Sequence, residues 1–263
     1  MSTDLITEHL DLWTSAVTYN NGKGRGNNGE PQLTGIQKLR ELILELAVRG
    51  KLVPQDPEDE PASKLLEHIE EEKKRLYKEG KIKKPKKLSE ISEEEKPYEV
   101  PEGWVWDRIG NYTYLEMGQS PKSQYYNQEG KGVPFFQGKA DFGNLYPTTR
   151  YWCTDPIKMS LPGDILLSVR APVGPTNISN IEACIGRGLC AVRPLSQASK
   201  LMVLYTLNAL RPKLEAQATG TTFSAVSRKD VESLPIPVPP VGEQQRIAKR
   251  IDELMALCDR LEQ

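Results

Sequence analysis

The chain has 263 residues, of which 38% are apolar and 27% are charged, and its formal net charge is −1. This length suits one or two domains, but the sequence contains no apolar run of the roughly 20 residues that a membrane-spanning helix needs, and Met1–Leu10 lacks the pattern of a secretion signal. Four scattered cysteines and two histidines, His9 and His68, give no metal-ligand spacing. We therefore expect a cytoplasmic protein with free thiols, no metal and no cofactor.

The first 34 residues predict a short helix followed by a linker. A helix is expected over Thr3–Val17, with an apolar side formed by Leu5, Ile6, Leu10 and Trp13. Residues 19–30, YNNGKGRGNNGE, are rich in glycine and asparagine and cannot bury apolar surface, so they predict a flexible segment. Its glycine spacing superficially suggests a phosphate loop, but no strand precedes it and no Gly-Lys-Ser/Thr sequence follows.

Residues 35–100 predict a helical lead-in with a charged hinge. Thr34 can cap a helix whose apolar residues recur at three-four spacing, namely Ile36, Leu39, Ile43 and Leu46. Three prolines then break the chain, and a second helix with a charged outer face is expected over Ala62–Lys78. The basic run Lys78–Lys87 follows, and the acidic run Ser89–Lys96 comes directly after it. Two interpretations stay open for the basic run: contact with nucleic-acid phosphates, or a solvated hinge neutralised by the acidic run.

From residue 101 to residue 240 the pattern changes to short apolar runs separated by glycine and proline, which predicts a mixed α+β domain. A helix is expected over Gln197–Leu210, with Leu201, Leu204, Leu207 and Leu210 directed inward and Pro212 ending it. Leu234–Pro240 has prolines at alternate positions and can only be an edge strand or an extended strap. The strands are expected at Trp104–Ile109, Tyr112–Met117, Val133–Gln137, Asp164–Arg170, Val173–Ile178 and Leu189–Val192.

Residues 241–263 predict one further helix that begins near Glu243. Its apolar residues are spaced four, three, four and three apart, which is the a/d spacing of a helix that needs another helix to cover it. The helix from Gly35 can provide that cover. The residues of this seam are Ile247, Ile251, Leu254, Cys258 and Leu261.

Three stretches of the sequence resemble one known family. They are Thr219–Gln263, with its polar loop, proline-rich strand and heptad helix; Gln37–Ile109, with LAVRGKLVPQDP and PEGWVW; and DILLSVRAPVG (Asp164–Gly174) with IGRGLCAVRP (Ile185–Pro194). Together they resemble the specificity subunit of type I restriction-modification systems, which chooses the DNA site and performs no chemistry. The resemblance covers most of the chain from about Gly35 onward.

The resemblance implies an architecture and a set of partners. In that family, two target-recognition domains sit at opposite ends of an antiparallel helical spacer and read the two parts of a split DNA site, together with modification and restriction subunits. Only one such domain is visible here, so the resemblance implies either a half-subunit that forms a homodimer or the front half of a longer protein. Helix packing or dimer contacts are then expected from Leu39, Ile43, Leu46, Ile247, Ile251, Leu254 and Leu261.

Three loops of the predicted domain carry the residue types that read base edges or bind phosphates. The alternative for each loop is ordinary turn chemistry, because glycine, serine, threonine and proline are common in turns. The charge balance is compatible with DNA, since residues 101–238 carry a net charge of +3 and the rest carry −4. The candidate residues are Gln119, Ser120, Lys122 and Tyr125 in the first loop, Gln137 and Lys139 in the second, and Thr221, Thr222 and Arg228 in the third.

Three arginines need separate consideration. Arg170 ends a predicted strand and Arg187 lies between two glycines, where the backbone can approach a ligand closely, so both are candidates for phosphate contacts. A structural role, in which a guanidinium binds loop carbonyls inside the domain, is equally open for these two and for Arg193.

Catalysis is not expected. The sequence lacks a nuclease pattern of acid, Asp or Glu, one residue and Lys, an adenine-methyltransferase Asn-Pro-Pro-Tyr/Phe motif, and a nucleotide-binding Gly-Lys-Ser/Thr loop. The competing class is a coiled-coil adaptor whose domain binds protein. A basic loop surface favours the DNA reading, and an exposed apolar patch favours the adaptor. A stand-alone DNA-modifying enzyme is a further, weaker alternative.

Overall fold

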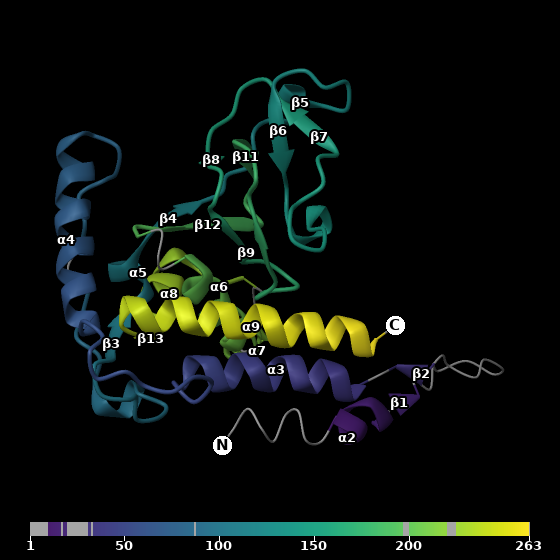
Figure 1. Ribbon diagram of the computed structural model, residues 1–263. Helices are drawn as coiled ribbons and strands as arrows, with labels where there is room; N and C mark the ends of the chain where they lie inside the picture. The colour runs from purple at the N-terminus through teal and green to yellow at the C-terminus, as the bar shows by residue number, and fades with distance from the viewer. Residues whose placement is uncertain are drawn as a thin grey trace.

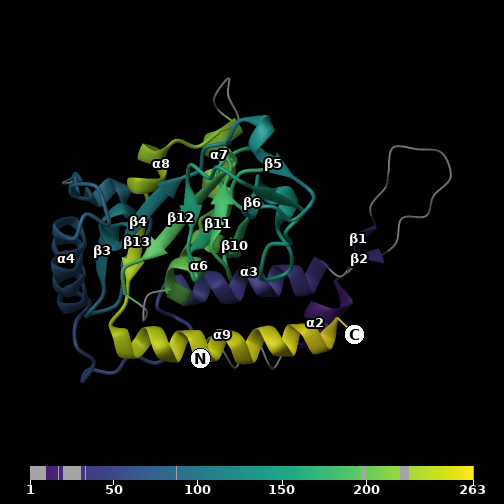
Figure 2. The same cartoon turned by 90° about the horizontal axis from the view of Figure 1, so that it is seen from above.

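The computed structural model describes residues 10–16, 18–19, 31–32, 34–86, 88–196, 200–219 and 225–262. It has an α+β fold in which a pair of long helices lies along one side of a mixed domain (Figures 1 and 2). The described helices are α2 (Leu10–Ser15), α3 (Thr34–Val48), α4 (Ala62–Lys78), α5 (Ile109–Tyr112), α6 (Lys200–Ala209), α7 (Arg211–Thr219), α8 (Arg228–Glu232) and α9 (Val241–Leu261). Among them, none is both long and apolar enough to cross a membrane.

A four-stranded antiparallel sheet forms the centre of the domain, in the order β10 (Thr176–Ile178), β9 (Ile165–Ser168), β12 (Leu189–Pro194) and β4 (Thr113–Met117). It is buried on both faces because its apolar residues point alternately to two different clusters. Ile165, Leu167 and Val192 pack with residues of α5, α6 and α8. Leu166 and Ala191 pack on the other side, against Phe136 and Ile185 of the second sheet.

The second sheet has five short strands, in the order β5 (Tyr126–Asn127), β7 (Tyr151–Cys153), β6 (Val133–Phe136), β11 (Ala183–Ile185) and β8 (Met159–Ser160). Strands β6 and β11 run parallel, with Ile185 opposite Phe136. The sequence pattern does not predict β5, β7, β8 or β11, because runs of two or three residues show no measurable alternation. This sheet rises away from the helical pair in Figure 1.

Strands β3 (Val105–Arg108) and β13 (Pro235–Val238) form a separate antiparallel ribbon. The prediction that the proline-rich segment forms an edge strand is confirmed, since β13 pairs on one side only. Prolines at positions 235 and 237 cannot donate hydrogen bonds to a second neighbour. The ribbon leads directly into α9, which begins at Val241 rather than near Glu243.

Helices α3 and α9 pack antiparallel, as predicted, and each covers the apolar seam of the other (Figures 1 and 2). Arg40 of α3 binds Asp259 at 2.7 Å and Glu262 at 2.9 Å near the end of α9. The two helices enclose an apolar cluster, which residues from α6 and Trp104 complete. Its fully buried members include the predicted packing residues Leu39, Ile43, Ile247, Ile251 and Leu254, together with Ile36, Ala47 and Cys258, whereas Leu46 and Leu261 are only partly buried.

The start of α9 is fastened to the loop that follows α3. Trp104 Nε1 donates to Glu243 Oε2 at 2.7 Å, and Gln55 Nε2 donates to Glu243 Oε1 at 2.8 Å. Burial raises the pKa of the Glu243 carboxyl, although both hydrogen bonds act in the opposite direction. Arg246, one turn further, pairs with Asp59. These contacts fix the direction in which α9 leaves the domain.

Several sequence predictions differ from the structure in detail. The helix that α6 forms is buried on several sides, so Met202, Val203 and Tyr205 belong to the core while Leu201 is 36% exposed. The helix α6 ends at Ala209, before Pro212 as predicted, but a further helix, α7, begins at Arg211 with Pro212 in its first turn, where a proline needs no hydrogen-bond partner. The hydroxyl of Thr34, the first residue of α3, donates to the carbonyl of Ala16 at 3.2 Å. All four cysteines are buried free thiols.

Candidate nucleic-acid interface

Loops that lie far apart in the sequence meet at one edge of the two sheets. The loop after β4 lies on the turn between β11 and β12, where Gln119 N donates to Ile185 O at 3.0 Å. In the same place Arg187 N donates to Ser120 Oγ at 3.3 Å. Two of the predicted candidates, Ser120 and Arg187, are therefore in direct contact although 67 residues separate them.

Glycines allow the turn between β11 and β12 to press against the end of β6. Gly186 N donates to Phe136 O at 2.8 Å. A Cβ added at Gly188 would stand 2.7 Å from Gln137 O, which is closer than real Cβ atoms come. The backbone that carries the exposed residue Arg187 therefore lies close to the backbone of the exposed residue Gln137.

A buried carboxylate holds the second candidate loop. Asp141 Oδ2 accepts hydrogen bonds from Gln137 N at 2.6 Å and Gly138 N at 3.2 Å. Its other oxygen, Oδ1, accepts from Arg150 Nη2 at 2.6 Å and Nε at 2.9 Å. The side chain of Asp141 is completely buried. Gln137 and Lys139 therefore project into solvent from a turn whose backbone is fixed.

The third side of this region comes from the end of β9 and the segment before α8. Val169 N donates to Gly188 O at 3.0 Å, and Val226 N donates to Val169 O at 2.9 Å. Arg170 forms an isolated antiparallel bridge with Ala225. Thr221 and Thr222, which immediately precede this segment, lie outside the described residues.

We name this contiguous region the recognition rim and define it by Gln119, Ser120, Lys122, Gln137, Lys139, Arg170 and Arg187, all of which are exposed. The structure thus brings together seven of the eleven predicted DNA-binding residues. Lys122, Lys139, Arg170 and Arg187 make no ion pair with any described residue. Four cations without an ion-pair partner beside three polar side chains are suited to contact phosphates and base edges.

Two other predicted candidates are engaged in packing or pairing. Tyr125 is half-buried against the cluster of Phe135, Cys153 and Cys184, and its carbonyl accepts from Thr154 N at 2.8 Å. Arg228 Nε binds Glu232 Oε1 at 2.6 Å along α8. Neither side chain is as free to meet a ligand as those of the rim.

Arg193 has the structural role that the sequence left open. Its guanidinium binds both oxygens of the buried Asp164, at 2.8 and 2.7 Å, and lies over the ring of Tyr114. Asp164 also accepts from Leu161 N at 2.8 Å. Arg193 therefore holds the turn before β9 and does not face the rim.

Sequence reasoning missed Asp141 and Arg150. A carboxylate four residues after Gln137 in a glycine-containing turn is a recognisable capping pattern, but its partner Arg150 is identified only by the fold. Among the described residues, no group of three His, Cys, Asp or Glu side chains is placed to hold a metal ion.

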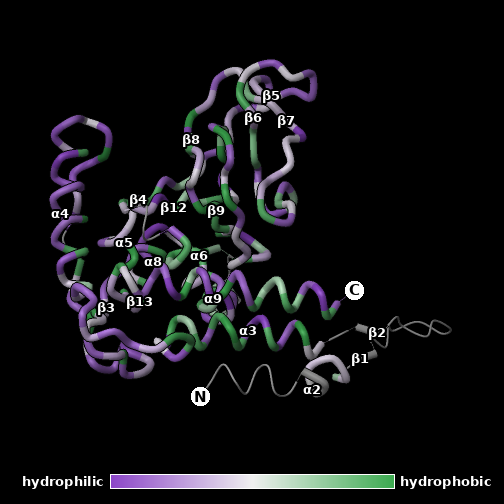
Figure 3. The backbone as a smooth tube through the Cα atoms, in the orientation of Figure 1, coloured by the Kyte–Doolittle hydropathy of each residue, from purple (hydrophilic) through white to green (hydrophobic). Residues whose placement is uncertain are grey.

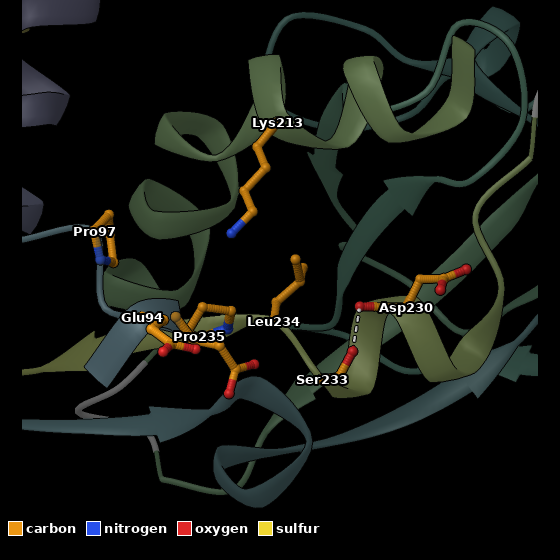
Figure 4. Close-up of a pocket in the computed structure, with 8 residues that line it drawn as sticks. Glu94, Pro97, Lys213, Asp230, Ser233, Leu234 and Pro235 are labelled. Atoms are coloured by element: carbon orange, nitrogen blue, oxygen red, sulfur yellow. Dashed lines mark hydrogen bonds between the residues drawn. The ribbon is translucent and has the colours of Figure 1, made fainter. Parts of the chain in front are cut away.

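A pocket of about 320 Å³ lies away from the rim, between β13, α7 and α8 (Figure 4). Its lining is polar and of mixed charge, with Lys213 extending toward Leu234 and Pro235 while Glu94 lies at its edge. Ser233 at its floor is satisfied by a hydrogen bond to Asp230 O at 3.3 Å.

Comparisons with known proteins agree on one family. The profile of the type I restriction modification DNA specificity domain matches residues 101–263. The chain is 41% identical to the specificity subunit of the type I restriction enzyme EcoAI from Escherichia coli, over 98% of this chain and 46% of that protein. It is 44% identical to the putative MjaX specificity subunit from Methanocaldococcus jannaschii, over 70% of this chain and 44% of that protein. The chain thus spans about half the length of the curated relatives that it matches.

Solved structures give the same result. The HsdS subunit from Thermoanaerobacter tengcongensis superposes with a TM-score of 0.58 at 33% identity, covering 96% of this chain and 61% of that one. A chain from a study of complex assembly and conformational transition of the type I R-M system superposes with a TM-score of 0.59 at 38% identity, covering 87% of this chain and 52% of that one.

Proposed function

Since this chain belongs to the family of type I restriction-modification DNA specificity domains, we propose that its recognition rim selects the DNA sequence on which a type I enzyme acts. The single observation that carries this proposal is the convergence of two loops and two arginine-bearing turns into one exposed basic region. Rigid backbone contacts support each loop, while the side chains of Gln137 and Arg187 are left in solvent. Such an arrangement can meet base edges without a large cost in loop ordering.

We propose that different rim residues have different tasks. Glutamine and arginine form paired hydrogen bonds with adenine and guanine edges, so Gln137 and Arg187 are the candidates for base reading. Lys122, Lys139 and Arg170 are candidates for phosphate contacts, which set position and contribute affinity at low salt. Thr221, Thr222, Tyr125 and Arg228 are secondary candidates.

The proposed partners are double-stranded DNA, a modification subunit and a restriction subunit. We propose that the chain contributes recognition and no catalytic step, and that a second recognition domain acts with this one, provided by a second copy of the chain in a homodimer if it functions as a half-subunit. The buried seam of α9 is covered by α3 and α6 within the chain, so this assembly must use other residues. The partly buried Leu44, Leu46, Met255 and Leu261 of the helical pair are the candidates.

Selection from a pool of random-sequence duplexes tests the proposal. The chain, alone and with modification subunits, is incubated with the pool at about 50 mM salt, where phosphate contacts are strongest, and bound DNA is sequenced over several rounds. We expect enrichment of a defined short sequence. Enrichment that never exceeds that of a protein-free control, in both preparations, would contradict the proposed function.

A variant of the rim and a matched control variant test whether the rim side chains bind the enriched duplex. Gln137→Ala with Arg187→Ala removes two exposed side chains, and we expect the enriched duplex to bind about 10- to 100-fold more weakly, as for the loss of one or two base contacts of about 1–3 kcal/mol. Lys249→Ala, at an exposed position on α9, is the control and should bind as the parent does.

A further inference from the structure

The end of α4 carries the most concentrated free positive charge of the described chain outside the rim. Lys78, Lys83, Lys84 and Lys86 are all exposed, and none of them pairs with a described carboxylate. We call these four residues the lysine tip. By contrast, the shaft of α4 neutralises itself through pairs such as Lys64 with Glu67 and Lys74 with Glu70.

The acidic run that follows the tip in sequence does not neutralise it. Glu95 binds Arg108 Nη1 at 2.7 Å, and Glu93 binds Lys96. Glu94 lines the pocket between β13 and α7 (Figure 4). The side chain of Arg108 is only 5% exposed, and it donates further hydrogen bonds to Ser89 O and Ser233 O at 2.9 and 2.7 Å. The acidic segment is therefore fixed on the body of the domain.

The tip has a defined conformation. Gly80, with φ of 69°, reverses the chain after α4. Lys81 N donates to Leu76 O at 2.9 Å and Gly80 N to Tyr77 O at 3.0 Å, which together form a Schellman motif. Ile82 is 8% exposed and anchors the following turn. These contacts hold the backbone from Leu76 to Ile82, and the exposed Lys83, Lys84 and Lys86 follow directly after it.

The lysine tip is placed where a duplex bound at the recognition rim could reach it. Helix α4 stands beside the domain, and it projects away from the helical pair in the same direction as the five-stranded sheet (Figure 1). The outer end of α4 is mostly hydrophilic (Figure 3). Lower on the shaft, Lys73 Nζ donates to Gly110 O at 2.6 Å and fastens α4 to the domain. A duplex is a stiff rod that continues past the base pairs at the rim, so a charged projection on the same side can reach it.

On this basis we propose that the lysine tip binds phosphates of the DNA duplex beside the sequence that the rim reads. Lysine ammonium groups attract phosphates as point charges and do not discriminate bases. The tip therefore adds affinity and salt dependence, and contributes no sequence preference. This inference rests on the proposed function, since it assumes that the chain binds DNA.

The experiment compares Lys83→Gln/Lys84→Gln/Lys86→Gln with the parent chain. Binding to a random-sequence duplex of about 40 base pairs and to the enriched duplex is measured by fluorescence anisotropy between about 50 and 200 mM salt. Each lost phosphate contact lowers the slope of log K against log salt by about 0.9, so we expect a decrease of roughly 2 to 3. Both duplexes should lose affinity by the same factor. Lys64→Gln/Lys74→Gln, two paired lysines of the same helix, should keep the parental slope.

The outcomes separate this inference from the proposed function. The triple arginine variant of positions 83, 84 and 86 should restore the slope, because arginine keeps the charge. If the parent binds DNA and the glutamine substitutions do not change the slope of log K against log salt, the proposed role of the tip is overturned. The proposed role of the rim is unaffected by that result. If those substitutions instead abolish binding of a modification subunit at an unchanged DNA slope, the tip is a protein-binding surface. A parent that binds no duplex would reject both proposals.

Discussion

At the scale of single residues, two arginine–carboxylate pairs position the parts of the chain that we assign to DNA. Arg108 is almost completely buried and keeps the acidic segment away from the lysine tip. Asp141 is completely buried and keeps the Gln137 turn in place. In both pairs the buried member also binds backbone atoms, so its removal leaves several polar groups without partners.

The pair of Glu95 and Arg108 predicts a dependence of stability on pH. The hydrogen bond from Arg108 lowers the pKa of Glu95 from 4.5 to about 2. A depressed carboxyl pKa stabilises the folded state above the unfolded pKa, and that stabilisation is lost as the pH falls through the folded pKa. The difference in free energy of unfolding between the parent and Glu95→Gln should be constant above about pH 5 and shrink between 4.5 and 2. Urea unfolding at a series of pH values measures it, and a difference unchanged at pH 2 would refute the pairing.

Asp141 should contribute more to the free energy of unfolding than its partner Arg150 does. Asp141→Ala removes the acceptor of two backbone N–H groups, and we expect a loss of about 3 kcal/mol in unfolding free energy. Arg150→Ala removes a half-exposed side chain and should cost about 1 kcal/mol or less. Asp141→Asn keeps one carbonyl acceptor and should fall between them. Urea unfolding ranks the three variants, and an equal cost for Arg150→Ala and Asp141→Ala would contradict the assigned roles.

At the scale of elements, the seam of α9 belongs to the folding core. Ile247 and Cys258 are completely buried, and Ile251 and Leu254 are 1% and 2% exposed. The heptad spacing predicts that a helix covers this seam, and the structure identifies that helix as α3 of the same chain. Heptad spacing alone cannot tell a partner in the same chain from one in another chain.

Substitutions on the two sides of α9 should therefore behave differently. Ile251→Asp with Leu254→Asp would bury two charges, and we expect the chain to unfold; even Ile251→Ala should cost about 3 kcal/mol. Met255→Asp changes a partly buried assembly candidate and should leave the fold intact while weakening assembly with a second helical pair. Circular dichroism and analytical ultracentrifugation separate the two effects. A folded Ile251→Asp/Leu254→Asp chain would show that the seam is not part of the core.

Elements with strong local determinants could be predicted from the sequence, and elements that depend on distant partners could not. The bounds of α4, Ala62–Lys78, agree with the prediction because Pro61 and Gly80 limit a continuous amphipathic pattern. By contrast, β11 has three residues and is a strand only because β6 and β8 lie beside it. The rim likewise has a part that could be predicted from the sequence and a part that could not. Its exposed side chains could be predicted from their chemistry, whereas the meeting of Ser120 with Arg187 depends on two nonlocal loops.

At the scale of the whole molecule, the three parts to which we give proposed roles lie apart. The rim lies at the edge of two sheets, the lysine tip stands on an outlying helix, and the α3–α9 pair runs along the other side of the domain (Figure 2). Contacts of Glu243 with Trp104 and Gln55 join the helical pair rigidly to the domain. In the proposed function, such a joint would let the helical pair set where the rim meets DNA relative to a second recognition domain.

The most direct test of the account is the ratio of the affinity for the enriched duplex to that for a scrambled duplex of the same composition. The account predicts that Gln137→Ala/Arg187→Ala moves this ratio toward one, whereas the glutamine variant of Lys83, Lys84 and Lys86 lowers both affinities and leaves the ratio unchanged. Fluorescence anisotropy at a single salt concentration measures both affinities for the parent chain and for each of the two variants. A parental ratio that survives loss of the two rim side chains would show that the sequence is read elsewhere on the molecule.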